Sequence, residues 1–174
     1  MLEFANLRWR VLVLGLIARL LPDSSATGAR RLLLRAMGLR IGARTRLLAL
    51  PVLQSSRPGS WTPRLRIGTD CHIGLRTILE FGEVVTIGDR VTLGDGAVIL
   101  TTTHQLGPRE RRAGDTVRSS VTIGDDASIG ENAIVLPGAN IGAGARVLAN
   151  SVVNGTVAPG ATVSGIPARV QRPK

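Results

Sequence analysis

The stretch VTIGDDASIGENAIVLPGANIGAGARV, residues 121–147, decides the fold of this chain of 174 residues. Every sixth residue in it is aliphatic: Ile123, Ile129, Val135, Ile141 and Val147. A small or β-branched residue stands two positions before each of them, and glycine often follows directly. A period of six fits neither the turn of a helix nor the alternation of a strand. It fits a coil with three flat sides, in which the aliphatic side chains point inward.

The same period continues on both sides of this stretch. It is found at Ile67, Ile73, Leu79, Ile87, Leu93, Ile99 and Val153. The step from Leu79 to Ile87 is longer than six, because two extra residues fall within Glu80–Glu83. Stacked coils pair their backbone groups with the coils on either side, which builds a core by stacking in one dimension. We therefore predict an all-β protein, a parallel β-helix of hexapeptide repeats with a helical segment at its amino-terminal side.

The sequence divides into three parts. Residues 67–174 form the predicted β-helix domain, which carries a loop at residues 101–120. Residues 41–66 contain a fragment with the same spacing, predicted as a degenerate first coil and connector. Residues 1–40 are predicted as a basic helical segment, with one helix across residues 11–21 and a second that ends at Gly38.

The excess of positive charge is confined to the first third of the chain. Residues 1–66 contain twelve arginines and two acidic residues, whereas residues 67–174 contain ten basic and ten acidic ones. A basic segment attracts anionic lipid headgroups or phosphorylated substrates. Helices rich in Leu and Arg suit a peripheral membrane contact through residues 1–40, and they suit packing on a neighbouring subunit equally well. A solvated surface without a specific partner is the third alternative.

Composition also narrows the cellular context. The apolar run at residues 11–21 is shorter than the roughly 20 residues that span a bilayer. It resembles a secretory signal, but the arginine-rich stretch behind it argues against export. We expect a cytoplasmic protein, with association at the inner face of the membrane as a further expectation.

Cys71 is the single cysteine, so no intrachain disulfide can form. The arginines come without an aromatic platform, so no nucleic-acid partner is expected.

One segment interrupts the repeat. Ile99 and Ile123 are in phase with each other, because a whole number of hexapeptides separates them, but the pattern is absent between them. The segment contains His104, one of two histidines in the chain. A polar excursion from a rigid solenoid is where a functional site is expected. Histidine suits general-base catalysis, because neutral imidazole can take the proton of a hydroxyl near neutral pH.

The residues of this segment carry a family resemblance. Thr103-His104 is followed by Pro108, Arg111 and Gly114 in the spacing Pro-x-x-Arg-x-x-Gly. With the repeat around it, the chain resembles the hexapeptide-repeat acyltransferases, in the branch of maltose, galactoside, serine and colanic-acid-type acetyltransferases. The resemblance implies left-handed winding and a homotrimer with active sites between subunits. It also implies direct transfer from acetyl-CoA, or another acyl-CoA, to a hydroxyl of a sugar, polysaccharide precursor or natural product.

The resemblance further implies roles for single residues. His104 is the expected general base, and Thr103 and Arg111 are expected to contact substrate. Glu80 and Glu83 lie in the two-residue insertion, where one of them is a candidate for facing the acceptor and a structural role is the alternative. The expected CoA-binding residues are Ser128, Ala149, Asn154, Arg169 and Arg172, with the two arginines on the CoA phosphates. No metal and no permanently bound cofactor are expected.

Ser128 departs from the family pattern, because many relatives have Trp at its position. The smaller side chain is expected to loosen the donor channel, which would admit a longer acyl group.

Three other functions are compatible with a hexapeptide repeat. A carbonic anhydrase of the same fold needs three histidines on zinc, and this chain has two. A non-catalytic solenoid scaffold or membrane-docking protein is the main alternative, and it predicts no stabilisation by CoA. An antibiotic-inactivating acetyltransferase would differ only in its acceptor.

Overall fold

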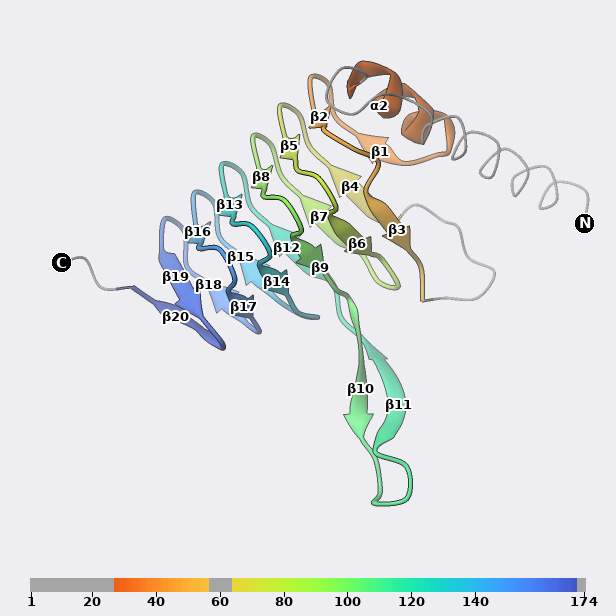
Figure 1. Cartoon of the computed structure of the whole chain (residues 1–174), viewed down its shortest axis with the longest axis vertical. Coiled ribbons are helices and arrows are strands. Elements are labelled where there is room, and N and C mark those ends of the chain that lie inside the picture. Colours follow the sequence, from red (N-terminus) through yellow and green to blue (C-terminus); the bar gives the residue numbers. More distant parts are fainter. Residues whose placement is uncertain (1–26, 57–63, 172–174) are drawn as a thin grey trace, which may run out of the picture.

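The computed structural model describes residues 27–56 and 64–171. Within these ranges the chain forms one helix, α2 (Thr27–Ala36), followed by a stack of short strands (Figure 1). The helix predicted across residues 11–21 lies outside the described residues. In the part of the chain that the structure describes, no helix is long and apolar enough to cross a membrane.

Three sheets form the sides of the stack. Sheet A contains β1 (Arg40–Ile41), β4 (Leu65–Ile67), β7 (Val85–Ile87), β12 (Val121–Ile123), β15 (Asn140–Ile141) and β18 (Thr156–Val157). Sheet B contains β2 (Arg46–Leu47), β5 (His72–Ile73), β8 (Thr92–Leu93), β13 (Ser128–Ile129), β16 (Arg146–Val147), β19 (Thr162–Gly165) and β20 (Ala168–Val170). Sheet C contains β3 (Val52–Gln54), β6 (Ile78–Glu80), β9 (Val98–Ile99), β14 (Ile134–Val135) and β17 (Val152–Val153). Because each coil adds one parallel strand to each sheet, the predicted parallel β-helix is confirmed. In these three sheets, β20 departs from the rule by folding back antiparallel on β19 at the last coil.

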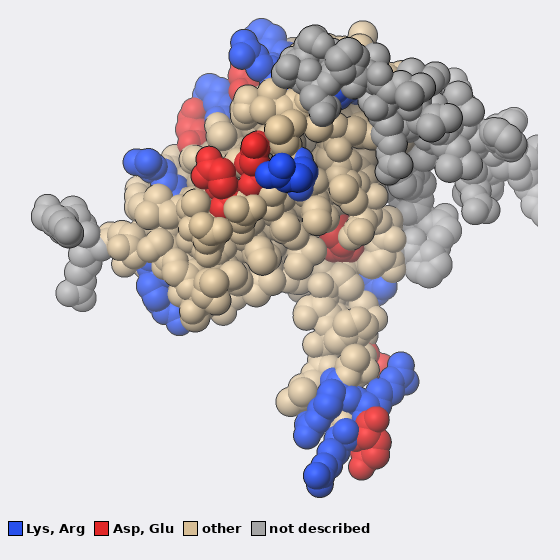
Figure 2. Space-filling view, in the orientation of Figure 1, with Lys and Arg blue, Asp and Glu red and all other residues tan. Residues whose placement is uncertain are grey.

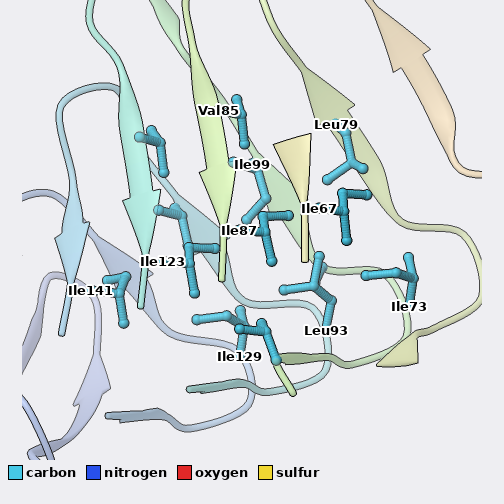
Figure 3. Packing of buried hydrophobic residues seen from close by; sticks show 14 of the residues in the cluster. Ile67, Ile73, Leu79, Val85, Ile87, Leu93, Ile99, Ile123, Ile129 and Ile141 are labelled. Carbon is cyan, nitrogen blue, oxygen red and sulfur yellow. The ribbon is translucent and has the colours of Figure 1, made fainter. Parts of the chain in front are cut away.

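The core is a set of aliphatic columns that run along the stack. In sheet A, Ile67 pairs with Ile87, Ile87 with Ile123, and Ile123 with Ile141. Figure 3 shows these side chains pointing into the stack together with those from the other two sheets. The small residues of the repeat, such as Ala127, are buried beside them. The hexapeptide spacing therefore sets both the register of the strands and the composition of the core.

Departures from the regular spacing gather at one edge of the stack. We call the segments that lead from a strand of sheet C to the next strand of sheet A the C–A corner. The coil from Ile123 to Ile141 is regular and consists of three hexapeptides. The coil from Ile67 to Ile87 is longer, because the two-residue insertion lies between β6 and β7. The step from Ile87 to Ile123 is longer still, because a hairpin is inserted between β9 and β12. Both insertions lie at the C–A corner.

Helix α2 covers the open end of the first coil. Arg30 is 1% exposed, and its Nη1 donates to the carbonyl oxygens of Leu47 at 3.2 Å and Leu48 at 2.8 Å. Leu34, also buried, packs into the core below. No earlier coil pairs with these strands in the described part of the chain, so their carbonyls need donors from elsewhere. The second predicted helix therefore packs on the first coil of its own chain, rather than on a membrane or a neighbouring subunit, through Arg30 and Leu34.

Candidate active site

The segment that interrupts the repeat is a β-hairpin rather than the predicted loop. Strands β10 (Thr102–Leu106) and β11 (Ala113–Arg118) pair antiparallel, with Thr102 opposite Arg118 and His104 opposite Thr116. The hairpin leaves the stack at the C–A corner and extends away from it (Figure 1). The β-branched residues along both strands favour this pairing, although they are too polar to produce the core pattern.

His104 lies on the exposed part of β10, and the hairpin fixes its tautomer. Its Nδ1 lies 3.1 Å from the carbonyl oxygen of Gly114 on β11. A carbonyl oxygen can only accept, so Nδ1 carries the proton of the neutral ring and donates it to this bond. The lone pair is then on Nε2, on the opposite edge of the imidazole. This arrangement is suited to a group that accepts a proton from substrate.

The structure gives a role to Gly114, the last residue of the motif, which the sequence alone does not. A Cβ at this position would lie 3.0 Å from the carbonyl oxygen of Gln105 and 3.2 Å from the Cα of Gly107. A side chain would push the two strands apart at the level of His104. Gly114 is part of the motif in the sequence, but only the pairing of the strands shows that its carbonyl orients the histidine.

The other motif residues lie elsewhere on the hairpin. Thr103 is exposed on β10, opposite Val117. Arg111 is exposed in the turn, where its backbone N–H donates to the carbonyl oxygen of Pro108 at 3.0 Å. Figure 2 shows basic side chains gathered at the far end of the hairpin, to which Arg109 and Arg112 also belong. The tip therefore presents positive charge to an incoming molecule.

Glu80 and Glu83 are held at the root of the hairpin. The carboxylate of Glu80 is buried, and it accepts hydrogen bonds from Thr101 and Thr102. Burial alone raises the pKa of Glu80, but hydrogen bonds from Thr101, Ser56 and Thr102 outweigh it and lower the pKa to about 2. Glu83 is half-buried and forms an ion pair with Arg64 at 3.2 Å. Both carboxylates are thus engaged with protein groups.

The predicted CoA-binding residues occupy different edges of the stack. Asn154 lies at the C–A corner after β17, two coils beyond the hairpin, a distance of about 10 Å along the stack. Ser128 is half-buried on β13 of sheet B, and Ala149 lies exposed in the turn from sheet B to sheet C. Arg169 is exposed on β20, at the edge of sheet B, whereas Arg172 lies outside the described residues. One chain therefore does not bring all of these residues together with His104.

The single cysteine of the chain and its second histidine lie in another part of the fold. Cys71 and His72 line an open cavity of about 520 Å³ between α2 and the first coils. Burial raises the pKa of the Cys71 thiol, whose Sγ donates to the carbonyl oxygen of Gly88 at 3.1 Å. Among the described residues, no group of three His, Cys, Asp or Glu side chains is placed to hold a metal ion.

Comparison with known proteins places this fold in a family. Residues 120–155 match the family model "Bacterial transferase hexapeptide (six repeats)", and residues 64–101 match "Hexapeptide repeat of succinyl-transferase". A hexapeptide-repeat-containing acetyltransferase from Vibrio cholerae is 32% identical, with a TM-score of 0.76 over 98% of this chain and 92% of that one. The chain therefore belongs to the hexapeptide-repeat acetyltransferase family, whose members wind as left-handed β-helices.

Further relatives agree with this assignment. The Vibrio cholerae protein has also been solved in complex with acetyl coenzyme A. A maltose O-acetyltransferase from Clostridium difficile is 26% identical, with a TM-score of 0.74 over 95% of this chain and 84% of that one. A curated relative from Schizosaccharomyces pombe, named as an acetyltransferase, is 36% identical over 108 residues, which are 59% of this chain and 52% of that one. The match thus spans about half the length of that relative.

Proposed function

We propose that the protein transfers an acetyl group from acetyl-CoA to a hydroxyl of a sugar, polysaccharide precursor or natural product, with His104 as the general base. The observation that carries the proposal is the contact between His104 Nδ1 and the Gly114 carbonyl oxygen at 3.1 Å. It leaves the lone pair on Nε2, where an acceptor hydroxyl can bind. The relatives from Vibrio cholerae and Clostridium difficile described above are acetyltransferases, and the first is known with acetyl-CoA bound.

The reaction follows from this tautomer. Nε2 takes the proton of the acceptor hydroxyl while the oxygen attacks the thioester carbonyl carbon. The tetrahedral intermediate collapses with cleavage of the C–S bond, and the imidazolium returns the proton to the departing CoA sulfur. No covalent acyl-enzyme is needed. The thiol of Cys71 is unsuited to form one, because it is buried and its pKa is raised.

The donor site is proposed to lie between subunits of a homotrimer. Support comes from the separation described above: His104 and Asn154 lie at the C–A corner, whereas Ala149 lies at the turn from sheet B to sheet C. Packing the C–A corner of one copy against the other edge of a second copy would bring the two sets together. Arg169, with Arg172 beyond the described residues, would then meet the CoA phosphates.

The test of the activity begins with thermal unfolding at equal protein concentration, with and without acetyl-CoA. At about 100 times its dissociation constant, a ligand stabilises the folded protein by roughly 2.7 kcal/mol, which raises the Tm. This increase in Tm should be smaller in Arg169→Ala. A screen of sugar and natural-product hydroxyls, read as CoA release, should then find an acceptor whose acetylation falls about 10²- to 10⁴-fold in His104→Ala. His72→Ala is the matched control, because this histidine lies on β5 of sheet B and not at the C–A corner.

Two results would count against the proposal. If neither acetyl-CoA nor longer acyl-CoAs stabilise the protein, the result favours the alternative function, a non-catalytic scaffold. If His104→Ala acetylates the acceptor as fast as the parent, another group is the base. Sedimentation velocity tests the trimer separately, and a monomer with full activity would contradict a site between subunits.

A further inference from the structure

The root of the hairpin is built around the carboxylate of Glu80. This residue ends β6 at the C–A corner and is 6% exposed. Its Oε2 accepts from the backbone N–H of Thr101 at 2.7 Å and from the Thr101 hydroxyl at 2.5 Å. Its Oε1 accepts from the backbone N–H of Gly82 at 2.8 Å and from the Thr102 hydroxyl at 2.8 Å. Each carboxylate oxygen thus accepts from one backbone N–H and one threonine hydroxyl, and the Ser56 hydroxyl also lowers the pKa of this carboxylate.

This set of partners requires a carboxylate rather than a neutral group of the same shape. A hydroxyl can rotate to offer either its proton or its lone pairs, but a backbone N–H can only donate. Since both oxygens face an N–H, glutamine in either orientation would turn its NH₂ group against one of them. Aspartate would keep the charge but would be one methylene too short to reach Thr101 and Thr102 from the preceding coil. The low pKa of Glu80, about 2, agrees with a carboxylate that stays ionised in this network.

The network fixes both strands of the hairpin where they leave the stack. Thr101 precedes β10 and Thr102 begins it, and the Thr101 carbonyl oxygen accepts from the N–H of Ser119, just after β11, at 2.9 Å. Ser56, from the connector after β3, adds a second clamp. Its hydroxyl lies 2.6 Å from that of Thr102, and its carbonyl oxygen accepts from Arg118 Nη2 at 3.1 Å.

Close packing at the root leaves the network little freedom. A Cβ on Gly82 would lie 2.6 Å from Oε1 of Glu80 and 2.7 Å from the Thr102 hydroxyl oxygen. Beyond the root, the hairpin extends away from the stack (Figure 1), and an isolated two-stranded hairpin is only marginally stable in water. Its direction is therefore set mainly at the root, where Thr102 lies close to His104 in the chain.

We propose that Glu80 is a positioning residue, which aims His104 by locking the root of the β10–β11 hairpin to the preceding coil. The inference rests on the proposed function insofar as it assigns His104 as the base. It differs from the expectation that Glu80 faces the acceptor, because both oxygens are already bound to protein donors. A displacement of about 1 Å at the reacting atoms can reduce a rate by about 10²-fold. A small tilt at the root is thus sufficient to affect catalysis.

The test compares Glu80→Gln with a matched carboxylate variant, Asp95→Asn. Asp95 also accepts a backbone N–H from the neighbouring coil, that of Leu75 at 2.8 Å, but it lies at the turn from sheet B to sheet C. We expect Glu80→Gln to increase amide hydrogen exchange at least about tenfold in residues 101–119 and to leave residues 121–135 unchanged. The kcat for acetyl transfer should fall about 10- to 100-fold, with the acetyl-CoA dissociation constant within about twofold of the parent. Asp95→Asn should change neither the amide exchange of residues 101–119 nor the kcat.

The outcomes separate this inference from the proposed function. Unchanged exchange and kcat in Glu80→Gln would overturn it, and so would a raised acceptor KM at constant kcat, which indicates an acceptor contact. If the parent protein shows no acetyl transfer, the exchange experiment still decides whether Glu80 locks the hairpin. If Glu80→Gln does not fold, Thr102→Val removes one hydroxyl donor and spares the backbone bonds. It should give a smaller increase in exchange, and none would contradict the inference.

Discussion

Cys71 occupies the inward position of its coil that Ala127 and Ala145 occupy in later coils of sheet B. Its side chain is 1% exposed, and burial raises the pKa of the thiol. Both effects suppress the reactive thiolate. We predict that a thiol reagent such as Ellman's reagent leaves the folded protein unmodified and reacts stoichiometrically after denaturation. Cys71→Ala should keep full acetyl transfer, and loss of activity in a folded variant would implicate the thiol.

Glu80 also predicts how stability depends on pH. The folded state lowers its pKa from the ordinary value of 4.5 to about 2. A carboxylate with a lowered pKa in the folded state stabilises the protein above about pH 4.5, and this contribution disappears as the pH falls towards 2. The difference in unfolding free energy between the parent and Glu80→Gln should therefore be largest above about pH 5 and shrink below about pH 4. Urea unfolding at several pH values measures it, and a difference independent of pH would contradict the assignment.

At the scale of elements, α2 acts as a lid on the first coil. Arg30 brings two hydrogen bonds to carbonyls that no preceding coil satisfies in the described part of the chain. We predict that Arg30→Met destabilises the protein by about 1–3 kcal/mol, because buried carbonyls lose their donor. Arg40→Met is the control, since Arg40 is exposed on β1 and should change stability little. Denaturant unfolding checks both, and equal effects would show that general charge, not the cap, is responsible.

The β10–β11 hairpin is the element that local sequence describes least well. Its position was predictable, because the repeat stops after Ile99 and resumes at Val121. Its conformation was not, because strand pairing within it depends on a root held by Glu80 and Ser56 from earlier coils. Residues that are distant in sequence thus decide whether the polar segment forms a loose loop or an ordered pair of strands.

For the whole molecule, the repeat makes complete coils interchangeable. Deleting residues 121–138 removes one regular coil of three hexapeptides and puts Ile141 in the place of Ile123. We predict that this variant still folds, with a lower Tm, because the columns of the core keep their register. Circular dichroism during heating and gel filtration measure the result.

A deletion one residue shorter is the matched control. Removing residues 121–137 would put Asn140, rather than Ile141, in the inward position of Ile123. A slip of one residue turns polar side chains into the core of the following coil. This variant should fail to unfold cooperatively, and equal stability of the two deletions would contradict the register argument.

The sequence by itself determined the coil, the sheets and the contents of the core. A strictly local period of six fixes which side chains point inward, and Ile123, Ile129 and Val135 were assigned to the core correctly from spacing alone. The same pattern located the segment that carries His104. Only the tertiary structure decided the tautomer of that histidine, the cap formed by Arg30 and the role of Glu80. These depend on hydrogen bonds between residues well separated in the chain, such as His104 with Gly114 and Glu80 with Thr101. Stacking of coils and pairing of strands bring such residues together, and no local pattern records which donor meets which acceptor.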